Sequence, residues 1–204
     1  MNLPKTVGVI SLGCSKNRVD SEMLLGQLQA EGIQPVSDPA QAELIVVNTC
    51  GFIEPAKEES IDAIFEMARY KETGCCKVLL VTGCLSQRYP QALYDEMPEV
   101  DGFLGVANYG RVMEAVRSAC AGQRPLLTGE GERFLHCGRV LTTPPYSAYV
   151  KISDGCDNRC AYCAIPLIRG PYRSRPYEDI LGECRRLIRG GVSEITLIAQ
   201  DTSR

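Results

Sequence analysis

Three cysteines lie close together late in the chain, in the segment Gly155-Cys156-Asp157-Asn158-Arg159-Cys160-Ala161-Tyr162-Cys163. Their C-x-x-x-C-x-x-C spacing allows all three thiols to turn inward on one loop. A cuboidal iron–sulfur cluster has four irons and a tetrahedral zinc site takes four ligands, so three thiolates leave one metal position open. An open iron can bind a small molecule and give it an electron. The known use of that arrangement is radical chemistry on S-adenosylmethionine (SAM).

The loop has two alternative interpretations. A zinc site would pair two of these cysteines with a second close pair of ligands. The upstream candidates are His136 and Cys137, which the segment 142–145 separates from the loop. Alternatively, the three thiols are unrelated and simply buried, as cysteines often are. Neither alternative accounts for the rest of the chain.

Composition restricts the class of protein. The chain has 204 residues, 45% of them hydrophobic, which is enough for one complete α/β domain and part of another. Its eleven cysteines would indicate disulfides in a small secreted protein, but we find no signal segment and no long apolar run. Metal-binding thiols in a reducing cytoplasm, away from membranes, fit better. A net charge of −3 argues against a protein that coats nucleic acid generally.

Apolar runs alternate with helical patterns through the first part of the chain. In the first helical pattern, Leu24, Leu25 and Leu28 share one face. Asn108 is expected to cap a later helix. Strands that alternate with helices predict an α/β fold with a doubly wound parallel sheet. The expected strands cover residues 6–12, 44–47, 78–81 and 103–104, and the expected helices cover 19–30, 55–70, 91–97 and 111–119.

Three further cysteines each follow one of these strands. Cys14, Cys50 and Cys84 come just past the expected carboxyl ends, at the edge where open α/β sheets bind their ligands. Each has a glycine beside it, which lets backbone come close to a bound group. We expect these thiols to hold a second cluster with an open iron. The alternative is three core thiols that happen to lie at strand ends.

The remaining cysteines are not expected to bind a cluster. Cys75 and Cys76 precede the strand that Cys84 follows. At about 3.3 Å per residue, this puts them about 20 Å from Cys84, at the opposite edge of the sheet. The others are expected to pack rather than react: Cys120, Cys137 and Cys184.

Glycine and proline concentrate between residues 122 and 145. We therefore expect a linker there, between an N-terminal domain at 1–121 and a second domain at 146–204. The second domain is predicted to have a strand at 148–153, the cysteine loop, a helix at 176–189 and a strand at 194–198. One strand–helix unit and a further strand cannot close a barrel. We expect the sequence to be the front portion of a longer protein, better at binding clusters than at catalysis.

The late cysteine loop resembles the signature of the radical-SAM superfamily, with Tyr162 in the aromatic position before the last cysteine. Together with Gly13-Cys14, Asn48-Thr49-Cys50 and Thr82-Gly83-Cys84, it resembles the methylthiotransferase family over essentially the whole chain. Within that family, residues 11–22, 155–160, 168–170 and 199–204 look like the branch that modifies ribosomal protein uS12. The tRNA-modifying branch usually has other residues directly after the first cysteine and inside the late cysteine loop.

The resemblance implies a methylthiotransferase N-terminal domain, the truncated start of a radical-SAM partial (β/α) barrel, two 4Fe–4S clusters and SAM. In the family's scheme, one cluster binds SAM and gives it an electron, which yields a 5′-deoxyadenosyl radical, and the other cluster carries the sulfur. Backbone around Tyr162 would meet the adenine of SAM. The implied ligands are Cys156, Cys160 and Cys163 for the first cluster, and Cys14, Cys50 and Cys84 for the second.

The implied reaction places a methylthio group on the β-carbon of an aspartate in uS12, a protein of the small ribosomal subunit. That carbon is unactivated, so a radical is needed to remove its hydrogen. The resemblance also implies an electron donor such as flavodoxin or ferredoxin, a monomer, and a cytoplasmic location. Two alternatives stay open. One is a tRNA methylthiotransferase that acts on adenosine, and the other is a non-catalytic module that binds an iron–sulfur cluster or zinc.

Overall fold

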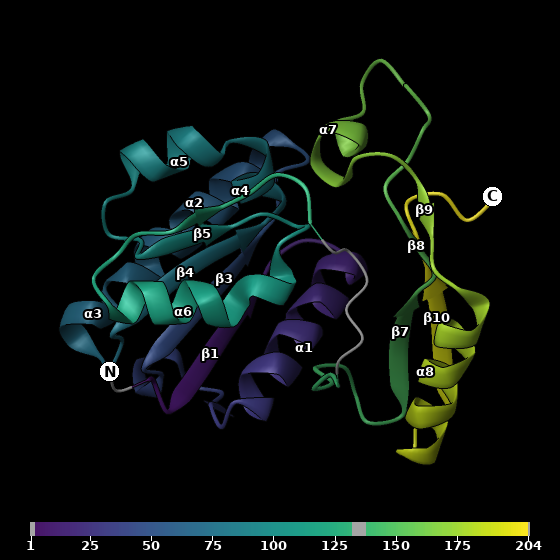
Figure 1. Ribbon diagram of the computed structural model, residues 1–204, viewed down its shortest axis with the longest axis horizontal. Coiled ribbons are helices and arrows are strands. Elements are labelled where there is room, and N and C mark those ends of the chain that lie inside the picture. The colour runs from purple at the N-terminus through teal and green to yellow at the C-terminus, as the bar shows by residue number, and fades with distance from the viewer. Residues whose placement is uncertain (1–2, 132–137, 204) are drawn as a thin grey trace.

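The computed structural model describes residues 3–131 and 138–203, and its first part is built on a six-stranded parallel sheet (Figure 1). The strand order is β2-β1-β3-β4-β5-β6. β3 and β4 are buried along their whole length, as expected of central strands with helices on both faces. The strands are β1 (Thr6–Ser11), β2 (Gln34–Pro35), β3 (Leu44–Thr49), β4 (Val78–Gly83), β5 (Gly102–Leu104) and β6 (Leu126–Leu127).

Helices cover both faces of this sheet. On one face Leu24 and Leu28 of α1 pack with Val112 and Val116 of α6, and on the other Ile64 of α2 packs into a separate core. The predicted doubly wound α/β fold is therefore confirmed. The helical segments are α1 (Ser15–Ala30), η1 (Pro39–Gln41), α2 (Glu54–Ala68), α3 (Tyr70–Thr73), α4 (Cys84–Arg88), α5 (Pro90–Glu96), η2 (Tyr109–Arg111) and α6 (Val112–Cys120).

Some details differ from the sequence-based expectation. The prediction that Asn108 caps a helix is wrong, because the turn η2 follows it and its side chain makes no capping hydrogen bond. α6 begins only at Val112. The segment expected as a linker supplies the sixth strand, since β6 pairs with β5. His136 and Cys137, the candidate partners of a zinc site, lie outside the described residues.

The second part of the chain lies beside α1 (Figure 1). β7 (Ser147–Lys151) and β10 (Glu194–Ile198) pair in parallel, and α8 (Tyr177–Arg189) packs on β7. This is one strand–helix–strand unit, the repeat from which (β/α) barrels are built. Between β7 and α8 come β8 (Ser153–Asp154), α7 (Ile165–Arg169) and β9 (Arg173–Ser174), with β8 and β9 antiparallel. In the described parts of the chain, no helix is long and apolar enough to cross a membrane.

Candidate metal centres

The three early cysteines lie at the carboxyl ends of adjacent strands. Cys14 follows β1 and immediately precedes α1, Cys50 follows β3, and Cys84 follows β4 and begins α4. The order of the strands reverses between β1 and β3, which is the position where open α/β sheets bind ligands. Cys50 packs closely on the first loop, since a Cβ added at Gly13 would lie 3.1 Å from its sulfur. The sheet therefore gathers these three thiols at one edge.

Cys84 is buried. Burial raises the pKa of its thiol, whereas the guanidinium of Arg169 lowers it and the nearby Cys50 and Cys14 raise it further. Repulsion from these two neighbouring thiols disfavours the thiolate form of Cys84. A positively charged metal group would relieve that repulsion.

The cysteines themselves are available as ligands. All ten that the structure describes are free thiols. Across residues 3–131 and 138–203, however, no three His, Cys, Asp or Glu side chains converge as the ligands of a single ion would. A cuboidal cluster places a core of several atoms between its thiolates, so its ligands need not meet at one point. Three free thiols at one sheet edge fit such a cluster, and their role as ligands stays a prediction.

Asn17, on the first turn of α1, ties the early loops together. Its side-chain amide donates to the carbonyl oxygens of Leu12 at 3.1 Å and Thr49 at 2.8 Å. Leu12 lies two residues before Cys14, and Thr49 lies directly before Cys50. Its side-chain oxygen accepts from the Cys84 thiol at 3.5 Å. One fully buried side chain thus contacts the segments that carry all three thiols.

The late cysteine loop is anchored at its start and closed by a turn at its end. The Cys156 amide donates to the Gly170 carbonyl at 3.1 Å, and the Cys163 amide donates to the Cys160 carbonyl at 3.0 Å. Cys156 and Cys163 are half-buried and Cys160 is exposed. Tyr162 is 88% exposed, so its ring is free to meet a ligand that approaches from solvent. The loop holds its three thiols near the surface, and their ligand role also stays a prediction.

A buried charge network joins the two parts of the chain. Arg169, at the end of α7, pairs with Asp20 of α1 at 2.8 Å and with Asp154 of β8 at 3.4 Å. Lys151 of β7 pairs with the same two carboxylates, at 2.7 and 3.4 Å. Although burial opposes it, the two cations hold the pKa of Asp154 at about 2. Two cations and two carboxylates therefore neutralise one another inside the protein.

The guanidinium of Arg169 extends this network to the early thiols. It donates to the Asn17 side-chain oxygen at 2.8 Å and to the Cys84 sulfur at 3.8 Å. On its other side, Asp154 accepts from the Gly155 amide at 3.0 Å, directly before Cys156. A continuous set of polar contacts therefore runs from one candidate site to the other.

The sequence analysis did not identify these polar residues. A signal is visible in hindsight along α1, where Asn17, Asp20 and Ser21 continue the helix face of Leu24 and Leu28. Polar residues in line with an apolar stripe indicate a buried polar contact. Arg169 and Lys151 carry no comparable signal, because only the fold brings them to α1.

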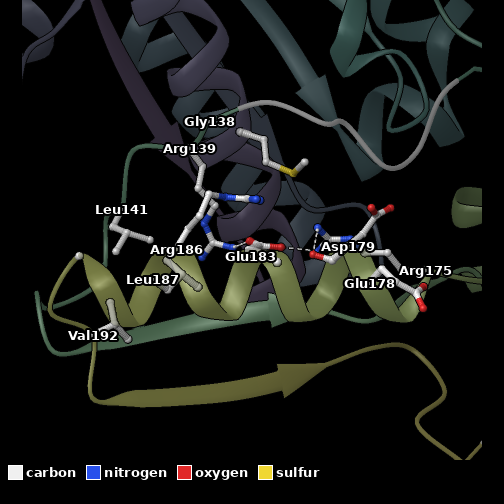
Figure 2. A pocket seen from close by; sticks show the side chains of 13 residues that line it. Gly138, Arg139, Leu141, Arg175, Glu178, Asp179, Glu183, Arg186, Leu187 and Val192 are labelled. Carbon is white, nitrogen blue, oxygen red and sulfur yellow. Dashed lines mark hydrogen bonds and ion pairs between the residues drawn. The ribbon is translucent and has the colours of Figure 1, made fainter.

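A cavity of about 580 Å³ lies between α1 and α8, and no cysteine is among the described residues that line it. Figure 2 shows Arg139 reaching toward Glu183 of α8, with Arg186 nearby. Arg139 pairs with Glu183 at 2.5 Å and with Glu22 of α1 at 2.9 Å, while Glu183 also pairs with Arg175. These contacts form a second link between the two parts of the chain.

Two family models match the chain. Residues 6–105 match UPF0004, described as an uncharacterized protein family, and residues 150–203 match the radical SAM superfamily. The first match covers β1 through β5 with all three early cysteines. The second covers the late cysteine loop, α8 and β10.

Curated relatives are similar over almost the whole chain. The ribosomal protein uS12 methylthiotransferase RimO of Desulforamulus reducens is 52% identical over 202 residues, covering 98% of this chain and 46% of the relative. The proteins of the same name from Pelotomaculum thermopropionicum and Myxococcus xanthus are 50% and 48% identical, over 97% of this chain and 45% and 42% of their own lengths. The chain thus spans about half the length of the curated relatives it matches.

A solved structure has the same fold. The radical S-adenosylmethionine methyltransferase TsrM from Kitasatospora setae, with tryptophan substrate and a SAM analog bound, superposes with a TM-score of 0.63 at 13% identity. The match covers 97% of this chain and 48% of that chain. The chain therefore combines a UPF0004 match with a radical SAM match, and over almost its whole length it is similar to ribosomal protein uS12 methylthiotransferases.

Proposed function

We propose that this chain is the cluster-binding N-terminal portion of a ribosomal protein uS12 methylthiotransferase. In this proposal it holds two 4Fe–4S clusters, each through three thiolates. When bound, the clusters supply an electron for the cleavage of SAM and an open iron that carries the sulfur to be transferred. The early cluster would be held by Cys14, Cys50 and Cys84, and the late cluster by Cys156, Cys160 and Cys163.

One observation carries the proposal. The fold gathers three free thiols at the switch point of the sheet and connects them, through Arg169 and Asp154, to the loop that holds the other three. Two separate sets of three thiolates would each leave one iron without a protein ligand, as chemistry on a bound small molecule requires. Two sets of three thiols do not fit a structural zinc module, because structural zinc takes four protein ligands.

The protein's own residues would arrange the two sites. Asn17 would hold the early loops in place, and the backbone around the exposed Tyr162 would meet the adenine of SAM. Glycine at position 155 keeps the late loop close to the segment that follows α7, because a Cβ there would lie 2.2 Å from the Pro171 carbonyl oxygen. The chain therefore supplies positioning, and the clusters would supply the electrons.

The substrate in this proposal is an aspartate side chain of uS12 in the small ribosomal subunit. The names of relatives that are about 50% identical across the chain support uS12 over tRNA. The enzyme would act as a monomer in the cytoplasm, where ribosomes are found, with flavodoxin or ferredoxin as electron donor.

Mass spectrometry of both substrates tests the proposal. The gene for the full-length protein is deleted, and uS12 and tRNA are isolated from the deletion strain, from a strain with the restored gene, and from a strain restored with Cys84→Ser. We expect the methylthio group on uS12 to disappear in the deletion strain, return with the intact gene, and stay absent with Cys84→Ser. If the deletion strain instead lost a methylthio group from tRNA and kept the methylthio group on uS12, the choice of substrate would be overturned.

A further inference from the structure

Arg169 is placed unusually for a cation. It is 2% exposed, it belongs to the second part of the chain, and its guanidinium reaches the sulfur of Cys84 in the first part. Burying a guanidinium is costly unless it is paired and hydrogen-bonded. Here the carboxylates of Asp20 and Asp154 and the oxygen of Asn17 provide those partners. The fold therefore maintains a positive charge in contact with one candidate cluster ligand.

Hydrogen bonds and charges around the sulfur ligands are among the factors that set the reduction potential of an iron–sulfur cluster. A reduced cluster carries one more negative charge than an oxidised one. A cation that contacts a ligand sulfur therefore stabilises the reduced state more than the oxidised state, and raises the potential. The low dielectric of the buried site strengthens this effect.

Lys151 offers a natural comparison. It is buried in the same network as Arg169. Like Arg169, it pairs with the carboxylates of Asp20 and Asp154. Its hydrogen bonds go to those carboxylates, whereas Arg169 donates to the sulfur as well. Equivalent changes at the two positions remove one buried cation each, and only one of them removes a contact with Cys84.

We infer that Arg169 is a positioning residue that reaches across from the radical SAM part to the Cys84 thiolate and raises the reduction potential of the cluster held there. This inference rests on the proposed early cluster and goes beyond it. It makes the electron affinity of the early cluster depend on how α7 docks against α1 and α4. The early site would then accept electrons readily only when the late loop is in place.

The test measures the midpoint potential of the early cluster alone. The 204-residue chain with Cys156→Ala, Cys160→Ala and Cys163→Ala is reconstituted anaerobically and titrated with electron paramagnetic resonance detection. Further variants add Arg169→Gln, Arg169→Lys, Lys151→Gln or Asp20→Asn to that background. Iron content is measured for each, because it reports the folding of the site independently of the potential.

We expect Arg169→Gln to lower the potential, and Arg169→Lys to stay closer to the parent because the charge is kept. Lys151→Gln should shift it less than Arg169→Gln. Asp20→Asn should raise it, because a carboxylate beside the guanidinium is lost. Shifts of opposite sign at two positions cannot come from general damage to the site. The Asp20→Asn result also decides the matter if Arg169→Gln fails to fold.

Three results would overturn the inference. Equal shifts for Arg169→Gln and Lys151→Gln would show that the contact with sulfur is unimportant, and an unchanged potential in Arg169→Gln or Asp20→Asn would assign these residues a purely structural role. Absence of iron from the parent background would overturn the proposed early cluster, and this inference with it. Iron content thus separates failure of the proposed function from failure of the inference alone.

Discussion

The side-chain oxygen of Asn17 lies 3.5 Å from the sulfur of Cys84, and the amide group of the same side chain binds the carbonyl oxygens of Leu12 and Thr49. A single residue on α1 therefore sets the spacing of three strand ends. Because an amide side chain offers two donors and an acceptor, no aliphatic side chain can replace it. The geometry of the early site depends on this residue although it is not a ligand in our account.

Replacement of Asn17 by alanine should destabilise the sheet edge. Leaving buried carbonyl oxygens without donors costs about 1–3 kcal/mol each, so the free energy of unfolding should fall by several kcal/mol. Urea denaturation of Asn17→Ala measures it. Gln29→Ala is the matched control, because Gln29 is exposed on the same helix. A loss no larger than that of the control would contradict the assigned role.

Gly83 should not tolerate a side chain. It has φ +102°, and a Cβ there would lie 2.4 Å from the Thr49 carbonyl oxygen, so the loops before Cys50 and Cys84 would have to separate. Gly32 has a similar φ of +87° with nothing within 4 Å. Gly32→Ala should cost only the backbone strain, about 1–2 kcal/mol. Gly83→Ala should cost clearly more and also lower the iron bound at the early site. Equal losses of stability with full iron content would refute the close approach.

The ion pair of Glu22 and Arg139 should stabilise the junction between the two parts of the chain. Their side chains are 1% and 7% exposed, and Glu22 also accepts hydrogen bonds from Thr142. Breaking a buried pair typically costs about 3–5 kcal/mol, so Glu22→Gln should cost about 3 kcal/mol and speed proteolysis between residues 138 and 146. Glu31 and Arg117 form an exposed pair, and Glu31→Gln should cost under about 1 kcal/mol. Similar effects of the two changes on unfolding and proteolysis would contradict this ranking.

The neighbouring cysteines 75 and 76 provide an internal check on thiol reactivity. Cys75 is exposed, whereas Cys76 is buried and burial raises its pKa to about 11. Because the thiolate is the reactive form, Cys76 should be alkylated slowly by iodoacetamide at pH 8. Its rate should increase as the pH rises toward 11. Mass spectrometry of the peptides resolves the two sites, and equally fast labelling at pH 8 would show that Cys76 is not protected.

The same two cysteines test the placement of the early site. They precede β4 and Cys84 follows it, so the strand separates them. We expect the double change Cys75→Ser with Cys76→Ser to leave the iron content unaltered, and Cys84→Ser to remove the early cluster. The reverse outcome, with iron lost only from the double variant, would show that the cluster lies at the opposite edge of the sheet from Cys84.

Much of the fold could be predicted because its signals are local. The buried apolar runs of β3 and β4 and the leucines of α1 mark their elements directly, and the strand ends then place Cys14, Cys50 and Cys84. The two-residue strand β2 was missed because its only support is pairing with β1. β6 was read as part of a linker for the same reason. Elements this short have no periodicity of their own.

The connection between the two candidate sites could not be predicted from sequence. Asp20 and Arg169 are far apart in the chain, and each would ordinarily be assigned to the surface. Their burial depends on how α7 packs against the sheet edge, which is a long-range property of the fold. The expected cap at Asn108 is wrong for a related reason: the residue directly precedes η2, but its side chain is buried and makes no capping hydrogen bond.

Iron and sulfide analysis after anaerobic reconstitution tests whether the chain holds two separate clusters. The parent chain should bind about eight irons, because two sets of three thiolates each hold a four-iron cluster. Replacing Cys156, Cys160 and Cys163 by alanine should leave about half of the iron, and so should replacing Cys14, Cys50 and Cys84. Full iron content in either triple variant, or zinc in place of iron in the parent, would show that the chain does not hold two separate four-iron clusters.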